Sequence, residues 1–336
     1  MFEVYNKAAE LPQSWDQLVE GNIFLTKTIL GHLEKLNPCQ QTYHLDTTRG
    51  IALVTYKLKL DIFTFAQNIA LKVPVNIVGI PLSTAKSGYA LKDKARLEEM
   101  VQYIKSLKGF YLILNSEDEL NLAQGNTLPT CRLEIRWQKF SEYLQALRSH
   151  YRYRAKKALN KFNEVKITEL EDNNSFDQAM YRLYLEVYEH SEAKLEKLPI
   201  EFFREFPAKI FKFTLNNETI AFLQLVAKGE ELIFLLGGFH RSYNERLDLY
   251  YNLLLKLVDY AIEKGYKYLD LGQTAEETKL KLGASQYPKY MSAYHSNPLF
   301  NGVISKLIPS FSYQPYAIKH RVFKEENDEN PLGKMS

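Results

Sequence analysis

The segment from 210 to 282 constrains the fold more than any other part of the chain. It holds three runs rich in apolar residues, at 210–215, 219–227 and 231–238. From Phe211 to Leu215 apolar and polar residues alternate, which is the two-residue period of a strand. Asn216 and Gly229 supply turns between the runs. The pattern predicts a three-stranded antiparallel meander.

The next part of this segment has a helical period. Polar residues recur at steps of three and four on an otherwise apolar run, at Asn252, Lys256, Asp259 and Glu263. Gly265 stands where a left-handed C-cap belongs, and 266–272 is extended again. A strand that returns after a helix of this length pairs in parallel, so a ligand is expected beyond the carboxyl ends of that pair.

Bulk composition restricts the class of protein. A chain of 336 residues favours two domains or a duplicated one, and its net charge of +3 is too small to argue for nucleic acid by itself. Cys39 and Cys131 indicate neither a disulfide framework nor a metal site. No apolar run reaches the roughly 18 residues of a membrane span, and the N-terminus lacks a signal pattern. We therefore expect a cytoplasmic protein with no membrane partner.

The order of predicted elements occurs twice. The first half predicts helices at 11–21 and 24–36, a hairpin of 43–45 and 51–60, a strand at 73–80, a helix at 97–107 and a strand at 110–114. The second half predicts helices at 176–190 and 199–206, then the meander, its helix and its last strand, followed by a strand at 289–295, a helix at 302–308 and a disordered tail at 324–336. Residues 103–114 also resemble 260–271. A duplication explains this similarity, although two unrelated α/β units also look alike at this level.

A basic segment lies between the two halves. Residues 147–166 contain seven lysines and arginines against one acid, Glu164, together with an apolar stripe at helical spacing. The segment predicts an amphipathic helix that joins the domains. Its basic face is suited to the phosphates of a nucleotide cofactor or of RNA, or it is simply a solvated helix face.

Common catalytic motifs are absent from the sequence. There is no His-Glu-x-x-His and no cluster of Cys and His, so we expect no metal. Gly-x-Ser-x-Gly and Gly-x-Gly-x-x-Gly do not occur, and the loop at 79–87 lacks the glycine that precedes the lysine of a P-loop. Residue patterns alone therefore predict an α/β protein of two units without a catalytic signature.

Two segments carry a resemblance to a known family. The meander that ends in Gly237-Gly238, with the loop 239–246 and the long helix, resembles the acyl-CoA-binding half of the GNAT N-acyltransferase fold. The segment 269–283 resembles the FemAB-like branch, in which a strand ends in Asp-x-Gly and Phe-Lys-x-x-Phe-Gly follows. Here the second motif reads Thr-Lys-Leu-Lys-Leu-Gly from Thr278, so both aromatic positions are replaced. The likeness covers most of 140–300.

The resemblance implies a fold and a division of the chain. The fold is a mixed α/β sheet in two tandem GNAT-like units, each a mostly antiparallel meander with helices on both faces. The implied parts are a degenerate unit at 1–140, a basic linker helix at 141–168, an acyltransferase unit at 169–310 and an extension at 311–336.

The resemblance also implies a reaction and the residues that perform it. An acyl group passes from acyl-CoA, acetyl-CoA in the first instance, to an amine of an amino acid, an amino sugar or a cell-wall precursor. Donor binding is implied for Leu236, Gly237, Gly238, Arg241, Asn244 and Arg246, although the usual Gly-rich phosphate loop is absent. Catalytic roles are implied for Asp270, Lys279, Gln273 and Tyr290, and acceptor contacts for Tyr188 and His190.

Each catalytic candidate has a chemical reason. Acyl transfer needs a deprotonated amine, a donor for the oxyanion and a proton for the leaving group. Asp270 would accept a proton or orient the amine, while Lys279 would stabilise negative charge or bind a carboxylate or phosphate. Gln273 and Tyr290 would donate hydrogen bonds. Asp270 as a helix cap and Lys279 as a solvated side chain are the alternatives.

Two other functions remain open from the sequence. An aminoacyl-tRNA-dependent FemAB-type transferase would use the basic segment 148–166 for its tRNA, although the chain lacks a long coiled-coil insertion. A degenerate, non-catalytic binding protein would explain the missing phosphate loop and the replaced aromatics. The acceptor, the acyl group and the oligomeric state are not determined by the sequence.

Overall fold

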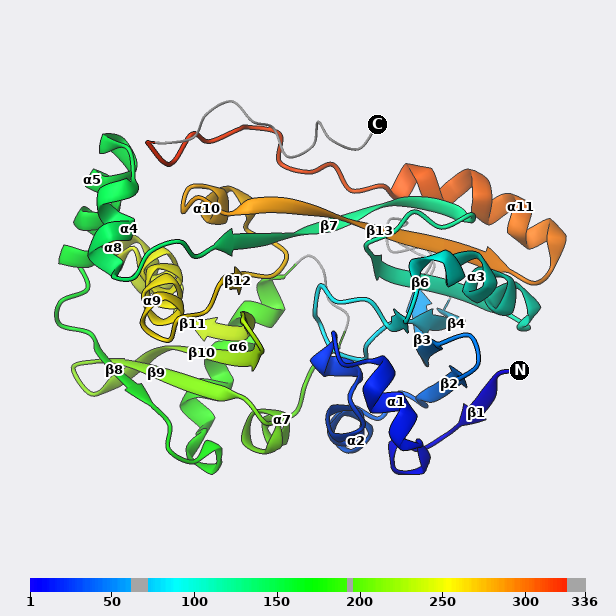
Figure 1. The fold of residues 1–336 in the computed structure, drawn as a ribbon. Helices are drawn as coiled ribbons and strands as arrows, with labels where there is room; N and C mark the ends of the chain where they lie inside the picture. Colours follow the sequence, from blue (N-terminus) through cyan, green and yellow to red (C-terminus); the bar gives the residue numbers. More distant parts are fainter. Residues whose placement is uncertain (62–71, 192–195, 325–336) are drawn as a thin grey trace. The chain divides into compact units, whose positions relative to one another are not determined.

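We describe the protein from a computed structural model that defines residues 1–61, 72–191 and 196–324. The fold is mixed α/β, as expected, and it divides into two compact units. Unit 1 comprises the described parts of 1–129, 194–206 and 288–315. Unit 2 comprises the described parts of 130–193, 207–287 and 316–336. Each unit thus collects segments that are far apart in the sequence (Figure 1).

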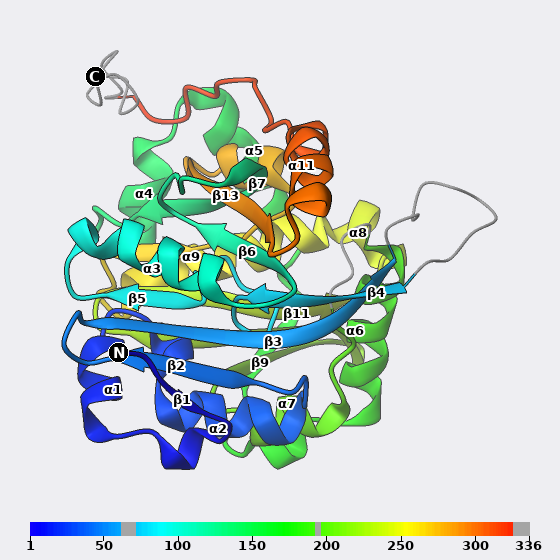
Figure 2. The same ribbon diagram turned by 90° about the vertical axis from the view of Figure 1, so that its right-hand side faces the viewer.

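Unit 1 is a sheet with helices beside it. Its strands are β1 (Glu3–Tyr5), β2 (Thr42–Asp46), β3 (Ile51–Asp61), β4 (Lys72–Val78), β5 (Tyr89–Leu91), β6 (Phe110–Ser116) and most of β13 (Ser285–His295). Its helices are α1 (Gln13–Leu18), α2 (Lys27–Leu36), α3 (Leu97–Ser106), α7 (Ile200–Glu205) and α11 (Pro298–Leu307). The strand order is β1-β2-β3-β4-β6-β13, and only the pair β4–β6 is parallel. Figure 2 shows β1 to β4 side by side.

Unit 2 has the same kind of sheet. Its strands are the end of β7 (Ala123–Glu134), β8 (Lys166–Glu169), β9 (Lys209–Leu215), β10 (Glu218–Lys228), β11 (Glu231–Phe239) and β12 (Tyr268–Asp270). Its helices are α4 (Phe140–Ala146), α5 (Ser149–Asn160), α6 (Gln178–His190), α8 (Ser242–Leu247), α9 (Leu249–Glu263) and α10 (Glu276–Leu280). The strand order is β7-β12-β11-β10-β9-β8, with β11–β12 parallel and the rest antiparallel. The predicted meander, its helix and the parallel return strand are confirmed.

Each unit contains a strand from the other half of the sequence. β7 follows β6 in the chain but pairs with β12, where Leu133 opposes Leu269. β13 follows β12 but pairs with β6, where Tyr294 opposes Tyr111. The observed units therefore differ from the continuous ranges expected from the sequence, and α5, expected as a linker, lies within unit 2. A duplication of one GNAT-like unit stays a prediction.

The side chain of Asn252 corrects the predicted polar stripe of α9. Asn252 is buried, and its amide donates to the carbonyl oxygens of Ala158 and Leu247 at 2.9 and 2.7 Å. A polar stripe on an amphipathic helix ordinarily faces solvent, but α5 packs against α9 at this point and the amide satisfies backbone groups there. Gly265, with a φ of +71°, ends the helix as expected.

Other local expectations need correction. The predicted loop 239–246 contains the short helix α8, and β7 and β8 were not predicted at all. The last helix begins at Pro298 rather than 302, because Asn297 caps its first backbone N–H groups. The predicted disordered tail lies outside the described residues from 325 onward. Among the helices of the described residues, none has the length and apolar character that a membrane span requires.

Candidate functional site

The parallel strands β11 and β12 separate halfway along β11. Their pairing ends where Ile233 opposes Asp270, whereas β11 continues to Phe239. The chain after β12 stays with β7 instead, because the N–H of Cys131 donates to the carbonyl of Gly272 at 3.1 Å. The two strands therefore diverge at the carboxyl end of the parallel pair, where the sequence predicted a ligand.

A β-bulge marks the same position on the other side of β11. Leu225 opposes Phe234 and Gln224 opposes Leu236, so Leu235 is an extra residue in β11. The side chain of Gln224 is fully buried, and neither its oxygen nor its nitrogen has a hydrogen-bond partner within the part of the chain that the structure describes. An unsatisfied buried amide is costly, and such groups are found at functional sites.

Lys279 is the most unusual charged group of unit 2. Lys279 is only 1% exposed to solvent, and its ammonium group donates to the carbonyl oxygens of Gly272 and Gln273 at 3.0 and 2.5 Å. Burial lowers the pKa of Lys279 to about 8, while Cys131 and other acidic groups nearby favour the charged form. The amine therefore changes its charge near pH 8, which is typical of a functional lysine.

Asp270 holds the turn that Lys279 binds. One carboxylate oxygen accepts from the hydroxyl of Thr130 at 2.7 Å and from the N–H of Gly272 at 2.8 Å. Gly272 has a φ of +72°, and Thr274 and Ala275 follow with φ values of +63° and +46°. Left-handed conformations at two consecutive non-glycine residues are strained, and strain of this kind collects at functional sites. The carboxylate of Asp270 therefore holds the turn whose carbonyl oxygens accept from Lys279.

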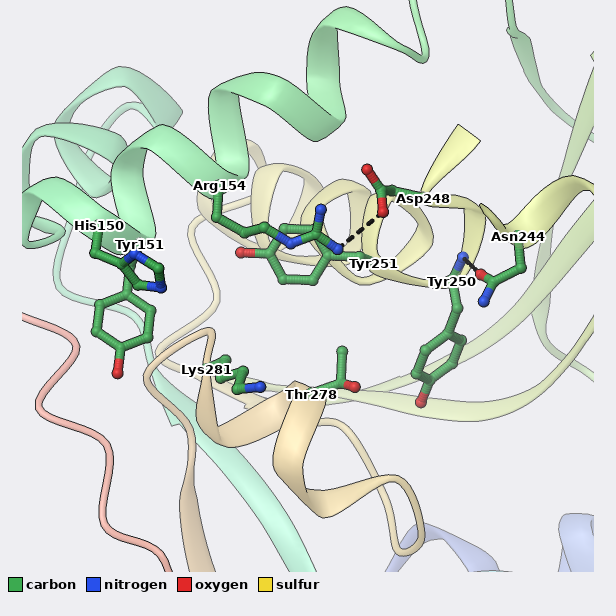
Figure 3. A pocket seen from close by; sticks show the side chains of 9 residues that line it. All are labelled: His150, Tyr151, Arg154, Asn244, Asp248, Tyr250, Tyr251, Thr278 and Lys281. Carbon is green, nitrogen blue, oxygen red and sulfur yellow. Dashed lines mark hydrogen bonds and ion pairs between the residues drawn. The ribbon is translucent and has the colours of Figure 1, made fainter. Parts of the chain in front are cut away.

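A cavity of about 240 Å³ is lined in part by Thr278 and Lys281, which flank Lys279 in the sequence. Figure 3 shows its lining from α5, α8, α9 and α10: His150, Tyr151, Arg154, Asn244, Asp248, Tyr250, Tyr251, Thr278 and Lys281. Arg154 pairs with Asp248 at 2.8 Å and lies over the ring of Tyr251. Lys161 pairs with Asp248 at 2.9 Å. Cationic groups thus outnumber the single acid of this lining.

The cavity adjoins the buried cluster around Lys279. Burial raises the pKa of Tyr250, which lines the cavity, and the neighbouring thiol of Cys131 adds to this effect. Burial also raises the pKa of Cys131 to about 11, against the influence of Lys279. Thr278 lines the cavity and is the residue before Lys279 on α10. Tyr250 and Thr278 are thus the lining residues nearest to this cluster by their electrostatic and sequence links (Figure 3 shows both in the lining).

The residues with implied donor roles are distributed over two places. Leu236, Gly237 and Gly238 lie on β11 beyond the point of separation. Asn244 lines the cavity and accepts from the N–H of Tyr250 at 3.0 Å. In contrast, neither Arg241 nor Arg246 is among the residues that line the cavity. The backbone N–H of Arg241 donates to the carboxylate of Glu186, and the guanidinium of Arg246 lies 5.1 Å from the ring of Tyr243.

Gly238 has a packing role that the sequence did not indicate. A Cβ atom at this residue would lie 2.5 Å from the ring of Phe222 and 2.6 Å from the backbone of Leu183 in α6. We therefore expect Gly238→Ala to destabilise the protein by about 2–3 kcal/mol, because a backbone rather than a flexible side chain must move. Urea unfolding would measure this loss. Gly302→Ala, where the added Cβ meets nothing within 4 Å, is the control, and equal stability of the two variants would contradict the packing role.

The remaining predicted residues lie in three other environments. Gln273 contributes its backbone carbonyl to the ammonium of Lys279. Tyr290 belongs to unit 1, where it opposes Ser116 in β6. Tyr188 and His190 are on α6, and the ring of His190 contacts the carbonyl of Glu186 at 2.7 Å. Their roles stay predictions.

Several site residues were missed by the sequence. Thr130, Cys131 and Gln224 were missed because β7 was not recognised and because a buried amide in a strand has no signature of its own. Arg154 was noted only as part of the basic helix. Within the described ranges, no group of three His, Cys, Asp or Glu side chains is arranged for a metal ion.

A comparison of the sequence with known protein families assigns the segment that contains Gln224, Asp270 and Lys279. Residues 146–280 match the family model described as "Acetyltransferase (GNAT) domain". The segment with the bulge, the diverging strands and the lysine is therefore a GNAT domain, and the class of protein is an acyltransferase enzyme. No curated protein sequence matches the chain.

Solved structures share the fold over almost the whole chain. L-PGS from Bacillus licheniformis is 12% identical, with 89% of this chain and 97% of that chain covered and a TM-score of 0.55. FemX is 11% identical, with 90% and 100% covered and a TM-score of 0.55. The C-terminal domain of a putative lysylphosphatidylglycerol synthetase from Agrobacterium fabrum is 9% identical, with 88% and 95% covered and a TM-score of 0.54. Together with the family match, these structures confirm the resemblance to the GNAT fold.

Proposed function

We propose that unit 2 transfers an acyl group to an amine of a small polar metabolite where β11 and β12 separate. The observation that carries this proposal is the buried ammonium of Lys279 beside that separation. The amine nitrogen forms the new amide bond, the ester or thioester bond of the donor breaks, and the proton of the amine passes to the leaving group. The acceptor classes are those expected from the sequence: an amino acid, an amino sugar or a cell-wall precursor.

The chain supplies the two kinds of charge stabilisation that this reaction needs. Leu236 and Gly237 pair with β10 but lie beyond the part of β11 that pairs with β12, and backbone N–H groups on that open side would donate to the developing oxyanion. Lys279 adds a positive charge that little water screens. Asp270 keeps the turn in place and favours the charged form of Lys279. Preorganised groups of this kind account for much of the rate of acyl transfer.

The cavity is suited to the phosphate-bearing end of the donor. His150, Arg154 and Lys281 line it, and tyrosine rings provide flat apolar surface. Acyl-CoA, acetyl-CoA first of all, and aminoacyl-tRNA both carry their acyl group on a molecule with phosphates and an adenosine. Both donors are therefore compatible with the charge of this cavity.

One observation favours an aminoacyl-tRNA donor. A CoA diphosphate binds free N–H groups at a helix N-terminus. At the start of α9, however, the side chain of Asn244 already accepts the N–H of Tyr250, and the carboxylate of Asp248 is adjacent. The N–H of Tyr250 is therefore not free for a diphosphate, and the carboxylate of Asp248 occupies part of the positive charge of Arg154 and Lys161 at this helix end.

The outer surface of α5 also favours an aminoacyl-tRNA donor. Lys156, Lys157, Lys161 and the exposed ring of Tyr153 line a second, shallow groove on this helix. Cations beside an exposed aromatic ring are typical of contacts with a nucleic acid backbone and its bases. The sequence analysis predicted that a FemAB-type transferase would bind its tRNA through the basic segment 148–166, which contains α5.

A binding experiment separates the two donors. We expect tRNA to bind the protein with an affinity that falls steeply with salt, and Lys156→Gln with Lys157→Gln to weaken binding about threefold to tenfold at moderate salt. Lys267→Gln, whose ion pair with Glu230 lies elsewhere in unit 2, is the matched control. Filter binding at several salt concentrations measures this effect.

Thermal unfolding with acetyl-CoA and with CoA tests the other donor. A ligand at 100 times its Kd adds about 2.7 kcal/mol, which raises the Tm by a few degrees. A shift with acetyl-CoA, without tRNA binding, would reverse the preference for aminoacyl-tRNA and retain the transferase. A protein that binds neither donor would contradict the proposed reaction and support the non-catalytic alternative.

A further inference from the structure

Helix α11 of unit 1 presents its apolar face to solvent. Leu299 is 82% exposed, Phe300 60%, Val303 55% and Leu307 49%, and Phe311 in the following 3-10 helix is 50% exposed. Residues 299, 303 and 307 are four apart and therefore share one face of the helix. Isolated exposed apolar residues are ordinary, but a cluster of five within thirteen residues indicates an interaction surface.

The opposite side of α11 fixes this orientation. The side chain of Asn301 accepts the backbone N–H of His295 at 3.0 Å, and Ile308 is buried at the end of the helix. The side chain of Asn297 caps the first turn by accepting from the N–H of Leu299 at 2.9 Å. The exposed face is thus held in place by polar and apolar contacts on the other side. We refer to Leu299, Phe300, Val303, Leu307 and Phe311 as the α11 patch.

The charged residues on α11 and in the chain on either side of it are basic. The sequence contains no Asp or Glu between Glu277 and Glu325, and Lys306 lies on α11 itself. The backbone of Ser296, just before the helix, donates to the carbonyl of Gly109 at 3.0 Å, which brings the preceding Lys108 to this end of α11. An apolar face bordered by lysines is the arrangement of helices that lie in a membrane interface.

We propose that the α11 patch docks unit 1 on a lipid bilayer with anionic headgroups. Leu299, Phe300 and Leu307 enter the boundary of the acyl chains, and Lys306 and Lys108 contact the headgroups. The helix lies in the interface and does not cross the bilayer. This surface is independent of the donor and acceptor of the proposed reaction.

The size of the patch favours a bilayer over a second copy of the chain. Ten helical residues extend about 15 Å, and a helix is about 10 Å wide, so the flat footprint of the face is roughly 150 Å², and its accessible area with the sides of the helix included is on the order of 400 Å². Stable protein interfaces bury about 800 Å² from each partner. A bilayer requires no complementary shape, and the lysines at the border of the patch would repel their counterparts in a symmetric dimer.

Vesicle co-sedimentation of the full chain tests the proposal. We expect the protein to sediment with vesicles of phosphatidylcholine and phosphatidylglycerol, and much less with phosphatidylcholine alone. Leu299→Ser with Phe300→Ser should reduce the partition coefficient at least about tenfold, because two buried side chains are lost from the interface. Lys306→Glu should reduce binding to the anionic vesicles about fivefold or more.

A control variant and a second measurement make the outcome decisive. Ile318→Ser replaces an apolar residue that is also exposed but lies outside the α11 patch, and it should bind like the unchanged protein. Since all these side chains are exposed, the Tm should stay the same in every variant. Absence of sedimentation, or equal sedimentation of the double variant, would overturn the proposal. Concentration-dependent dimers in sedimentation velocity that the double variant abolishes would assign the patch to a second copy instead.

Discussion

Replacing Lys279 by methionine should reduce the rate of acyl transfer by a factor of about 100 to 1,000. Methionine fills a similar volume but carries neither the charge nor the hydrogen bonds to the carbonyls of Gly272 and Gln273. Removing one preorganised group that stabilises an oxyanion has an effect of this size. Consumption of the donor, in the presence of mixed amino acids and amino sugars as acceptors, measures the rate.

Lys264 provides a matched control for this substitution. It follows α9, is not among the residues that line the cavity, and pairs with Glu263 at 2.9 Å on the surface, so Lys264→Met should change kcat by less than about threefold. Circular dichroism should show that both variants are folded. Full activity of the Lys279 variant would remove this side chain from the mechanism and contradict the proposal that its charge stabilises the transition state.

Replacing Asp270 by asparagine should change the pH dependence of the reaction. Burial lowers the pKa of Lys279 to about 8, and the charge of Asp270 acts in the opposite direction. If the charged form of Lys279 is the active one, the rate is constant below this pKa and falls as the pH rises through about 8. Without the carboxylate the pKa of Lys279 decreases further, so the fall begins at a lower pH.

The expected loss in Asp270→Asn is therefore largest at alkaline pH. We expect about fivefold lower kcat at pH 8 and a smaller loss at pH 6.5, since a pKa lowered by about one unit leaves roughly a tenth of the lysine charged at pH 8 instead of half. The asparagine oxygen still accepts from Thr130 and Gly272, so the fold should be retained. Asp259→Asn, on the surface of α9, is the control. An unshifted profile would show that Asp270 does not act through Lys279.

Local sequence patterns determined most elements of unit 2. The alternation from Phe211 to Leu215, the apolar run of α9 and Gly265 at its end predicted the meander, the helix and the parallel strand correctly. These features depend on contacts between near neighbours and on backbone preferences, which periodicity records. Lys279 was found for a different reason, because the residues around it resemble a family motif.

Sequence patterns did not predict the features that depend on contacts between segments far apart in the chain. Asn252 belongs to a polar stripe in the sequence, yet it is buried because α5 packs on α9. Thr130 and Cys131 join the site only because β7 pairs with β12 across about 130 residues of chain. The α11 patch was also missed, since a search for long apolar runs detects a helix that crosses a membrane but not one with a single apolar face.

The sequence by itself determined the strand–helix–strand order, the basic helix, and the resemblance that made an acyltransferase of the GNAT class the leading expectation. Only the tertiary structure decided that Lys279 is buried, that its pKa lies near 8 and that Asp270 holds the turn beside it. The physical reason is that a pKa depends on desolvation and on charges brought close in space. Neither quantity can be read from the spacing of residues along a chain.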